Sequence, residues 1–220
     1  MNQKNQLEKL ERSIKWIFKQ ILGTKKTYAA ILAVSEVTKK NNALSEYGDY
    51  FAYTQNVMVG DVLLQLSKFF VDNKDSHSVP KIIRISNDLF TEDYYKKTGY
   101  NQHTTYEKLK SELVQMEEEL DSLEKPISHL KKIRNRDLAH LDKRISNEES
   151  RENLIQSNPI YLSDVLYLFD FAFKSLSTIR GTLFNISFNF QEPSYIYELE
   201  KIAELIEKEK SIKKDQKEVI

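Results

Sequence analysis

The 220-residue chain contains no cysteine and only five glycines and four prolines. The absence of cysteine excludes a disulfide scaffold, a thiolate zinc site and a cysteine nucleophile. Glycine and proline together reach about half of their average usage or less. The chain is rich in lysine, glutamate, leucine and isoleucine instead, and this composition is typical of helical proteins.

Long apolar runs and net charge are also missing. The longest uninterrupted apolar run, from Tyr28 to Val34, has seven residues, whereas a membrane-spanning helix needs about 20. The N-terminus leads into an amphipathic pattern without the apolar centre of a signal peptide. We therefore expect a cytoplasmic protein with no membrane partner. The 33 basic and 33 acidic side chains cancel, which argues against a global basic field for nucleic acid but leaves a local basic patch open.

The sequence does contain a series of amphipathic stripes, in which apolar residues recur every three or four positions. Gly23 and Thr24 interrupt the first stripe and predict an N-terminal helical hairpin over about residues 5–42. A core over about residues 47–185 follows, and then a C-terminal helix over about 194–210 with a charged tail. The whole pattern predicts one all-α domain, built as an antiparallel helical bundle.

Charge changes sharply along one part of the chain. Residues 107–124 hold seven acids and two bases, whereas residues 125–144 hold seven bases and two acids. The structural interpretation is two solvated helix faces that attract each other. The functional interpretation is a basic strip, residues 125–144, that binds a phosphate backbone.

Arg134 interrupts an apolar series that runs from Ile127 to Leu141 within the basic strip. An arginine in an apolar stripe costs free energy unless it reaches solvent or is paired. Asp137, three residues further on, is the expected partner.

The order Arg134, Asn135, four further residues and His140 resembles the Arg-polar-x4-His signature of HEPN proteins (higher eukaryotes and prokaryotes nucleotide-binding). The block 138–142, and the apolar segment 69–72 that leads towards Ser78 and Pro80, are similar to the abortive-infection U-type branch of small bacterial phage-resistance proteins.

The resemblance implies a HEPN-like four-helix core with additional helices and a homodimer in which two motifs meet in one cleft. It also implies a metal-independent endoribonuclease that needs no cofactor and acts on RNA in phage defence. In this interpretation Arg134 clamps the phosphate and its transition state, Asn135 orients or supports the site, and His140 is the general acid and base.

These residue types suit RNA cleavage, in which the 2′-hydroxyl is the nucleophile. Histidine titrates near neutral pH and transfers protons, and arginine presents a permanently charged fork to two phosphate oxygens. One histidine per subunit is awkward for two proton transfers, and a dimer would supply a second.

The helical geometry leaves open whether Arg134 or Arg136 is the partner of His140. At about 100° per residue, Arg134 and His140 lie about 120° apart in projection. Asp137 falls between them and would support either one, and Arg136 shares a face with His140. The remaining bases of the strip are expected to contact RNA: Lys131, Lys132, Lys143 and Arg144.

Two other function classes stay open. One is a non-catalytic HEPN module that binds RNA or a nucleotide, or that is the toxin partner of an antitoxin or nucleotidyltransferase. The other is a helical scaffold that binds another protein. The tyrosines near the acidic helix, among them Tyr94, Tyr95 and Tyr106, fit either base stacking or packing at helix ends. His77, His103 and His129 are expected to be structural or solvated.

Overall fold

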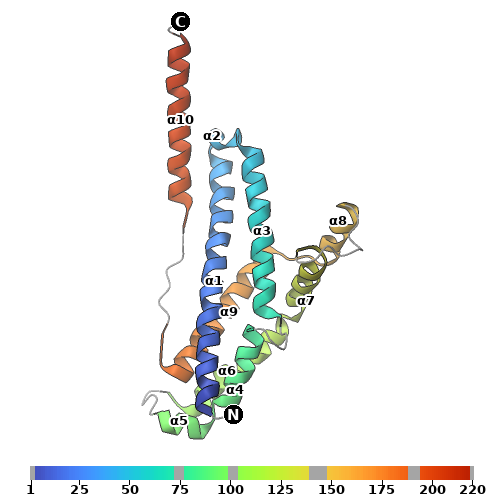
Figure 1. Ribbon diagram of the computed structural model, residues 1–220, viewed down its shortest axis with the longest axis vertical. Helices are drawn as coiled ribbons and strands as arrows, with labels where there is room; N and C mark the ends of the chain where they lie inside the picture. Colours follow the sequence, from blue (N-terminus) through green and yellow to red (C-terminus); the bar gives the residue numbers. More distant parts are fainter. Residues whose placement is uncertain (1–2, 72–76, 99–103, 139–147, 188–193, 219–220) are drawn as a thin grey trace. The chain divides into compact units, whose positions relative to one another are not determined.

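The computed structural model describes residues 3–71, 77–98, 104–138, 148–187 and 194–218. Every regular element within these ranges is a helix, which confirms the all-α prediction (Figure 1). None of the described helices combines the length and the apolar character that crossing a membrane requires.

One of the described helices is a π-helix, η1. Their bounds are α1 Gln3–Lys40, α2 Asn42–Ser45, α3 Gly48–Phe70, α4 Val79–Leu89, α5 Glu92–Thr98, α6 Tyr106–Ser122, α7 Glu124–Ile133, η1 Arg134–Leu138, α8 Glu148–Ser157, α9 Leu162–Phe184 and α10 Ile196–Glu218.

The chain forms two compact units. Unit 1 comprises Met1–Leu22 and Leu63–Phe190, and unit 2 comprises Gly23–Val62 and Gln191–Ile220. Each of the long helices α1 and α3 therefore has one segment in unit 1 and another in unit 2. The expectation of a single domain over residues 1–220 stays a prediction.

The N-terminal hairpin prediction is wrong, because α1 is one continuous helix of 38 residues. Gly23 and Thr24 lie in its interior. A glycine in a helix costs only about 1 kcal/mol relative to alanine. Thr24 is buried, and the apolar pattern continues through the buried Ile21 and Tyr28 on either side. Packing on both sides of Gly23 therefore outweighs its weak helical preference.

Unit 1 is built around α4, which packs against α6 and α9. Ser78 caps the start of α4, since its side chain accepts a hydrogen bond from the Lys81 backbone N–H, and Pro80 lies in the first turn. A hydroxyl cap and a first-turn proline are both local signals of a helix start. Lys110 of α6 donates to the Asn87 carbonyl of α4 at 2.6 Å, which ties the two helices together.

An aromatic cluster closes one end of unit 1. The buried Phe90 ring stacks on Tyr106, with centroids 5.5 Å apart, and meets Tyr94 and Tyr95 edge-on. The Tyr94 hydroxyl donates to the Leu183 carbonyl at 2.6 Å, and that of Tyr95 donates to the Thr104 carbonyl. These tyrosines pack at helix ends, so their abundance does not indicate a base-stacking surface.

Unit 2 has a smaller core, where α10 packs against α2 and the neighbouring parts of α1 and α3. Its members are the buried Val37, Leu44 and Ala203 and the partly buried Phe51, Ile196, Leu199 and Ile206. An ion pair of 2.6 Å between Lys210 and Glu46 adds a polar contact beside this core.

Candidate functional site

The helix that carries the candidate motif begins immediately after α6. Leu123 ends α6 and precedes Glu124, and Pro126 lies in the first turn of α7. Proline is tolerated there because a first-turn N–H has no helical partner. Leu130 and Ile133 form the buried face of α7. Pro126 therefore lies at the start of a new helix and does not kink α6.

Arg134 borders this buried face and is itself half-buried. The buried position next to it belongs to Ile133, at 4% exposure. A long cationic side chain in such a partly buried position can cover apolar surface with its stem and keep its charge near solvent.

The motif lies on a π-helical turn, Arg134–Leu138. Its first residue, Arg134, directs its backbone N–H to the Leu130 and Lys131 carbonyls at the end of α7. Single π-turns are rare and occur frequently at functional sites. A π-turn has more residues per turn than an α-helix, so the α-helical spacing assumed for the projection does not hold over Arg134–Leu138. His140 lies outside the described residues, so its angle to Arg134 and the face it shares with Arg136 stay predictions.

The guanidinium of Arg134 is fixed by its neighbour. Asn135 Oδ1 accepts hydrogen bonds from Arg134 Nε at 2.9 Å and from Nη2 at 2.7 Å. One edge of the planar fork is thereby held, and the Nη1 side is left for another acceptor. Asp137 was the expected partner; the structure describes its backbone alone, so a role for that carboxylate stays a prediction.

The basic residues before the motif face solvent. Lys131 and Lys132 are exposed, and Arg136 is half-buried. Within the described ranges, neither lysine forms an ion pair. His140, Lys143 and Arg144 lie outside the described residues, so their contributions stay predictions.

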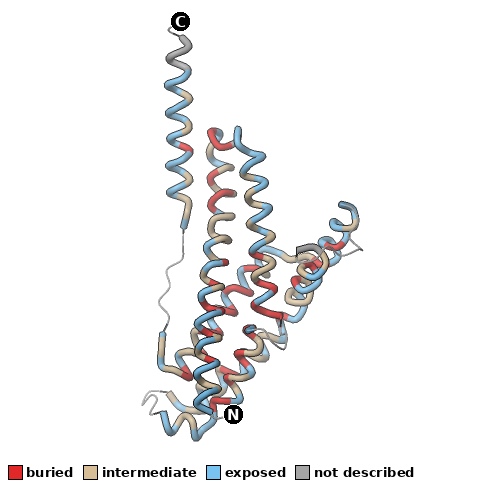
Figure 2. The backbone as a smooth tube through the Cα atoms, in the orientation of Figure 1, coloured by how far each residue is buried: buried red, intermediate tan, exposed pale blue. Residues whose placement is uncertain are grey.

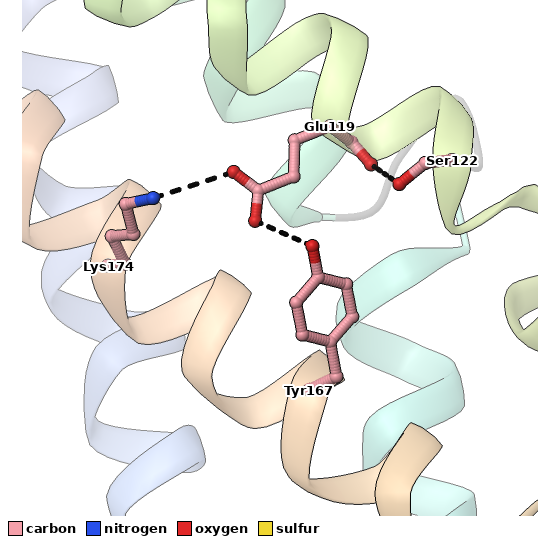
Figure 3. A network of polar contacts seen from close by, with 4 residues as sticks. All are labelled: Glu119, Ser122, Tyr167 and Lys174. Atoms are coloured by element: carbon pink, nitrogen blue, oxygen red, sulfur yellow. Dashed lines mark hydrogen bonds and ion pairs between the residues drawn. The ribbon is translucent and has the colours of Figure 1, made fainter.

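The acidic helix α6 directs one of its carboxylates to α9. Glu119 accepts a hydrogen bond from the Tyr167 hydroxyl at 3.0 Å and lies 3.6 Å from Lys174 Nζ (Figure 3). The hydrogen bond from the phenol to Glu119 raises the pKa of Tyr167. Glu119 is thus paired with residues of α9.

The two histidines that the structure describes have structural contacts, as expected. His129 donates from Nδ1 to the Pro159 carbonyl at 2.9 Å, which ties α7 to the segment before α9. His77 lies 2.8 Å from the Ser13 hydroxyl. His103 lies outside the described residues.

Comparison with known proteins decides the family. The profile of one family, AbiU2 of the HEPN proteins, matches residues 4–203. The chain belongs to the AbiU2 family of HEPN proteins. Its function is therefore of the abortive-infection HEPN type. No curated protein matches the chain, and no solved structure does.

The described part of the predicted site thus contains an arginine fork held by Asn135, close in sequence to exposed lysines. Across the described part of the chain, no three histidine, aspartate or glutamate side chains converge as metal ligands would. The expectation of a metal-free site stays a prediction. A half-buried, permanently charged fork is suited to bind phosphate oxygens and to stabilise negative charge that develops on them.

Proposed function

We propose that this AbiU2 protein is a metal-independent endoribonuclease that acts in bacterial phage defence by cleaving RNA in the infected cell. Arg134 stabilises the charge on the phosphate, Asn135 positions Arg134, and His140 transfers protons. Asp137 and Arg136 support the site. The active form in this proposal is a homodimer, whose two motifs share one cleft.

The observation that carries the proposal is the double hydrogen bond from Arg134 to Asn135 Oδ1. An arginine that served only to solvate a helix face would have no need of a fixed orientation. Holding one edge of the fork reduces the rotational freedom that phosphate binding would otherwise remove, and this preorganisation favours the charged transition state.

The proposed reaction needs no external nucleophile. The ribose 2′-oxygen attacks the adjacent phosphorus as its proton passes to a general base, and the bond from phosphorus to the 5′-oxygen breaks. That oxygen takes a proton from a general acid, which leaves a 2′,3′-cyclic phosphate and a 5′-hydroxyl. His140 serves as base in one copy and as acid in the other, because one imidazole cannot perform both roles at once.

In this proposal the basic strip binds the RNA backbone. Exposed Lys131 and Lys132 lie just before the fork, and Lys143 and Arg144 follow the motif in the sequence. Contacts of this kind neutralise phosphates without reading bases, and they weaken as salt concentration rises.

The test is RNA cleavage by purified protein in excess chelator. We expect cleavage to survive the chelator and to fall by about 10²-fold or more in both Arg134→Ala and His140→Ala. Asn135→Ala is expected to lower kcat more than it raises KM, because it loosens Arg134 without removing its charge.

Arg151→Ala is the matched control, since it removes an arginine on α8 that pairs with Glu148. Its rate should equal that of the unchanged protein. Cleavage that persists in the Arg134 and His140 variants would refute the site. RNA binding without cleavage by any form would refute the enzyme and favour a non-catalytic binding module.

A further inference from the structure

Helix α10 carries apolar residues on two faces, and only one of them is covered within unit 2. The covered face includes Ala203, which packs against Val37 and Leu44. A second stripe, formed by Ile202, Leu205 and Ile212, is 46%, 66% and 49% exposed. Its spacing of three and seven residues keeps these side chains on one side of the helix.

The neighbouring helix α3 has exposed apolar residues of its own, Tyr50, Tyr53 and Val57, and the exposed Tyr47 immediately precedes it. Val57 and Tyr195, which immediately precedes α10, line the same shallow hollow of about 500 Å³. Exposed apolar surface thus extends over two adjacent helices of unit 2. Several large apolar side chains exposed on the same elements mark an interaction surface more often than an accident of composition.

The charges of α10 indicate which partner fits. Residues 196–207 contain four glutamates and one lysine, whereas residues 208–213 contain three lysines and one glutamate. The helix is therefore acidic in its first half and basic in its second. Two copies placed antiparallel would set each acidic half against a basic half, whereas parallel copies would set like charges together.

We propose that α10 is a self-association surface, where the stripe Ile202, Leu205 and Ile212 packs antiparallel against the same stripe of a second copy of this chain. Such an interface is isologous, since each copy contributes the same patch. It is distinct from the motif cleft of the proposed ribonuclease, because α10 lies in unit 2 and Arg134 lies in unit 1.

Geometry gives the pairing a measurable signature. The stripe runs from Ile202 to Ile212, so an antiparallel pair is centred near Glu207. A rise of about 1.5 Å per residue then places the two copies of position 198 roughly 25–30 Å apart. A parallel pair would hold them about 10 Å apart, the usual distance between packed helix axes.

The first measurement is molar mass over a range of protein concentrations, by analytical ultracentrifugation. The motif cleft of the proposed ribonuclease gives a dimer by itself, so the α10 contact is expected to give assemblies larger than a dimer. Leu205→Glu is expected to return them to the dimer and to raise the dissociation constant of the α10 contact by about 100-fold or more, because each such contact loses two leucines and gains two buried charges. Val114→Glu is the matched control, an exposed apolar residue of α6, and should leave the mass unchanged. Circular dichroism checks that both variants remain helical.

The second measurement is the distance between spin labels on Glu198→Cys. The chain has no cysteine, so this label is unique. We expect the long distance of the antiparallel pair, its loss in the Leu205→Glu background, and weaker association as salt rises.

A mass that Leu205→Glu leaves unchanged would overturn the proposal, whether that mass is the monomer or the dimer expected at the motif cleft. A short label distance, or association that salt strengthens, would refute the antiparallel orientation. Arg134→Ala should retain the self-association, so the outcome here is separate from that of the ribonuclease test.

Discussion

Helices α9 and α10 are both 23 residues long, yet they are held in place differently. α9 has ten buried residues, whereas Ala203 is the single buried residue among the described side chains of α10 (Figure 2). α9 carries four charged residues and α10 carries thirteen. Equal helix length therefore does not imply equal contribution to the fold, because tertiary packing supplies most of the stability of a helix in a protein.

The two helices also differ in how their own residues support them. α9 ends at Asn185, which adopts the left-handed conformation and directs its N–H back to the Arg180 and Gly181 carbonyls. α10 relies on pairs along its surface, such as Lys213 with Glu209 at 2.6 Å and Lys201 with Glu204 at 3.1 Å. Exposed pairs of this kind contribute little to stability, because water and salt screen them.

The largest expected effect comes from the core of α9. Phe169 is fully buried, so Phe169→Ala should lower the free energy of unfolding by about 3–5 kcal/mol, through lost burial and the cavity left behind. Urea denaturation measures this change. Leu162→Ala, in the same helix at an exposed position, should change it by less than about 0.5 kcal/mol. Equal effects of the two substitutions would contradict the contrast between the faces of α9.

A smaller effect is expected in unit 2, where α10 packs over Leu44. Leu44→Ala should lower the free energy of unfolding by about 2 kcal/mol, at the low end for a buried leucine. The neighbouring side chains of a small core can move into the space that the leucine leaves. Amide hydrogen exchange should then accelerate about 30-fold in α10 and stay unchanged in α9.

Leu32→Ala, at an exposed position of α1, provides the control and should leave exchange in both helices unaltered. If exchange in α9 rises as much as in α10, the chain unfolds as one cooperative unit, and the contrast between the two helices does not extend to their stability.

The helix boundaries that were predictable from sequence depend on local chemistry. Ser78 and Pro80 indicate the start of α4, because a hydroxyl cap and a first-turn proline affect the backbone only within a few residues. Thr105 likewise caps α6 through the Lys108 N–H. The continuity of α1 through Gly23 was not predictable, because it depends on packing against residues distant in sequence.

The candidate site likewise has a part that was predictable from sequence and a part that was not. Arg134 could be singled out from sequence, since a charge in an apolar series and a neighbouring asparagine match a family signature. The π-turn could not, because helical periodicity assumes α-geometry throughout. The exposed stripe of α10 had a signal in the spacing of Ile202, Leu205 and Ile212. Periodicity alone does not tell which of two apolar faces is covered.

The smallest expected effect concerns Gly23, where unit 2 begins. A β-carbon added there meets nothing within 4 Å, so Gly23→Ala should raise the free energy of unfolding by about 0.5–1 kcal/mol, through a less flexible unfolded chain. Gly181→Ala in α9, equally open, should give a similar gain in urea denaturation. A gain at both positions would show that Gly23 weakens helical preference without ending the helix. A loss at Gly23 alone would favour a reversal of the chain there, and with it the hairpin that its sequence suggests.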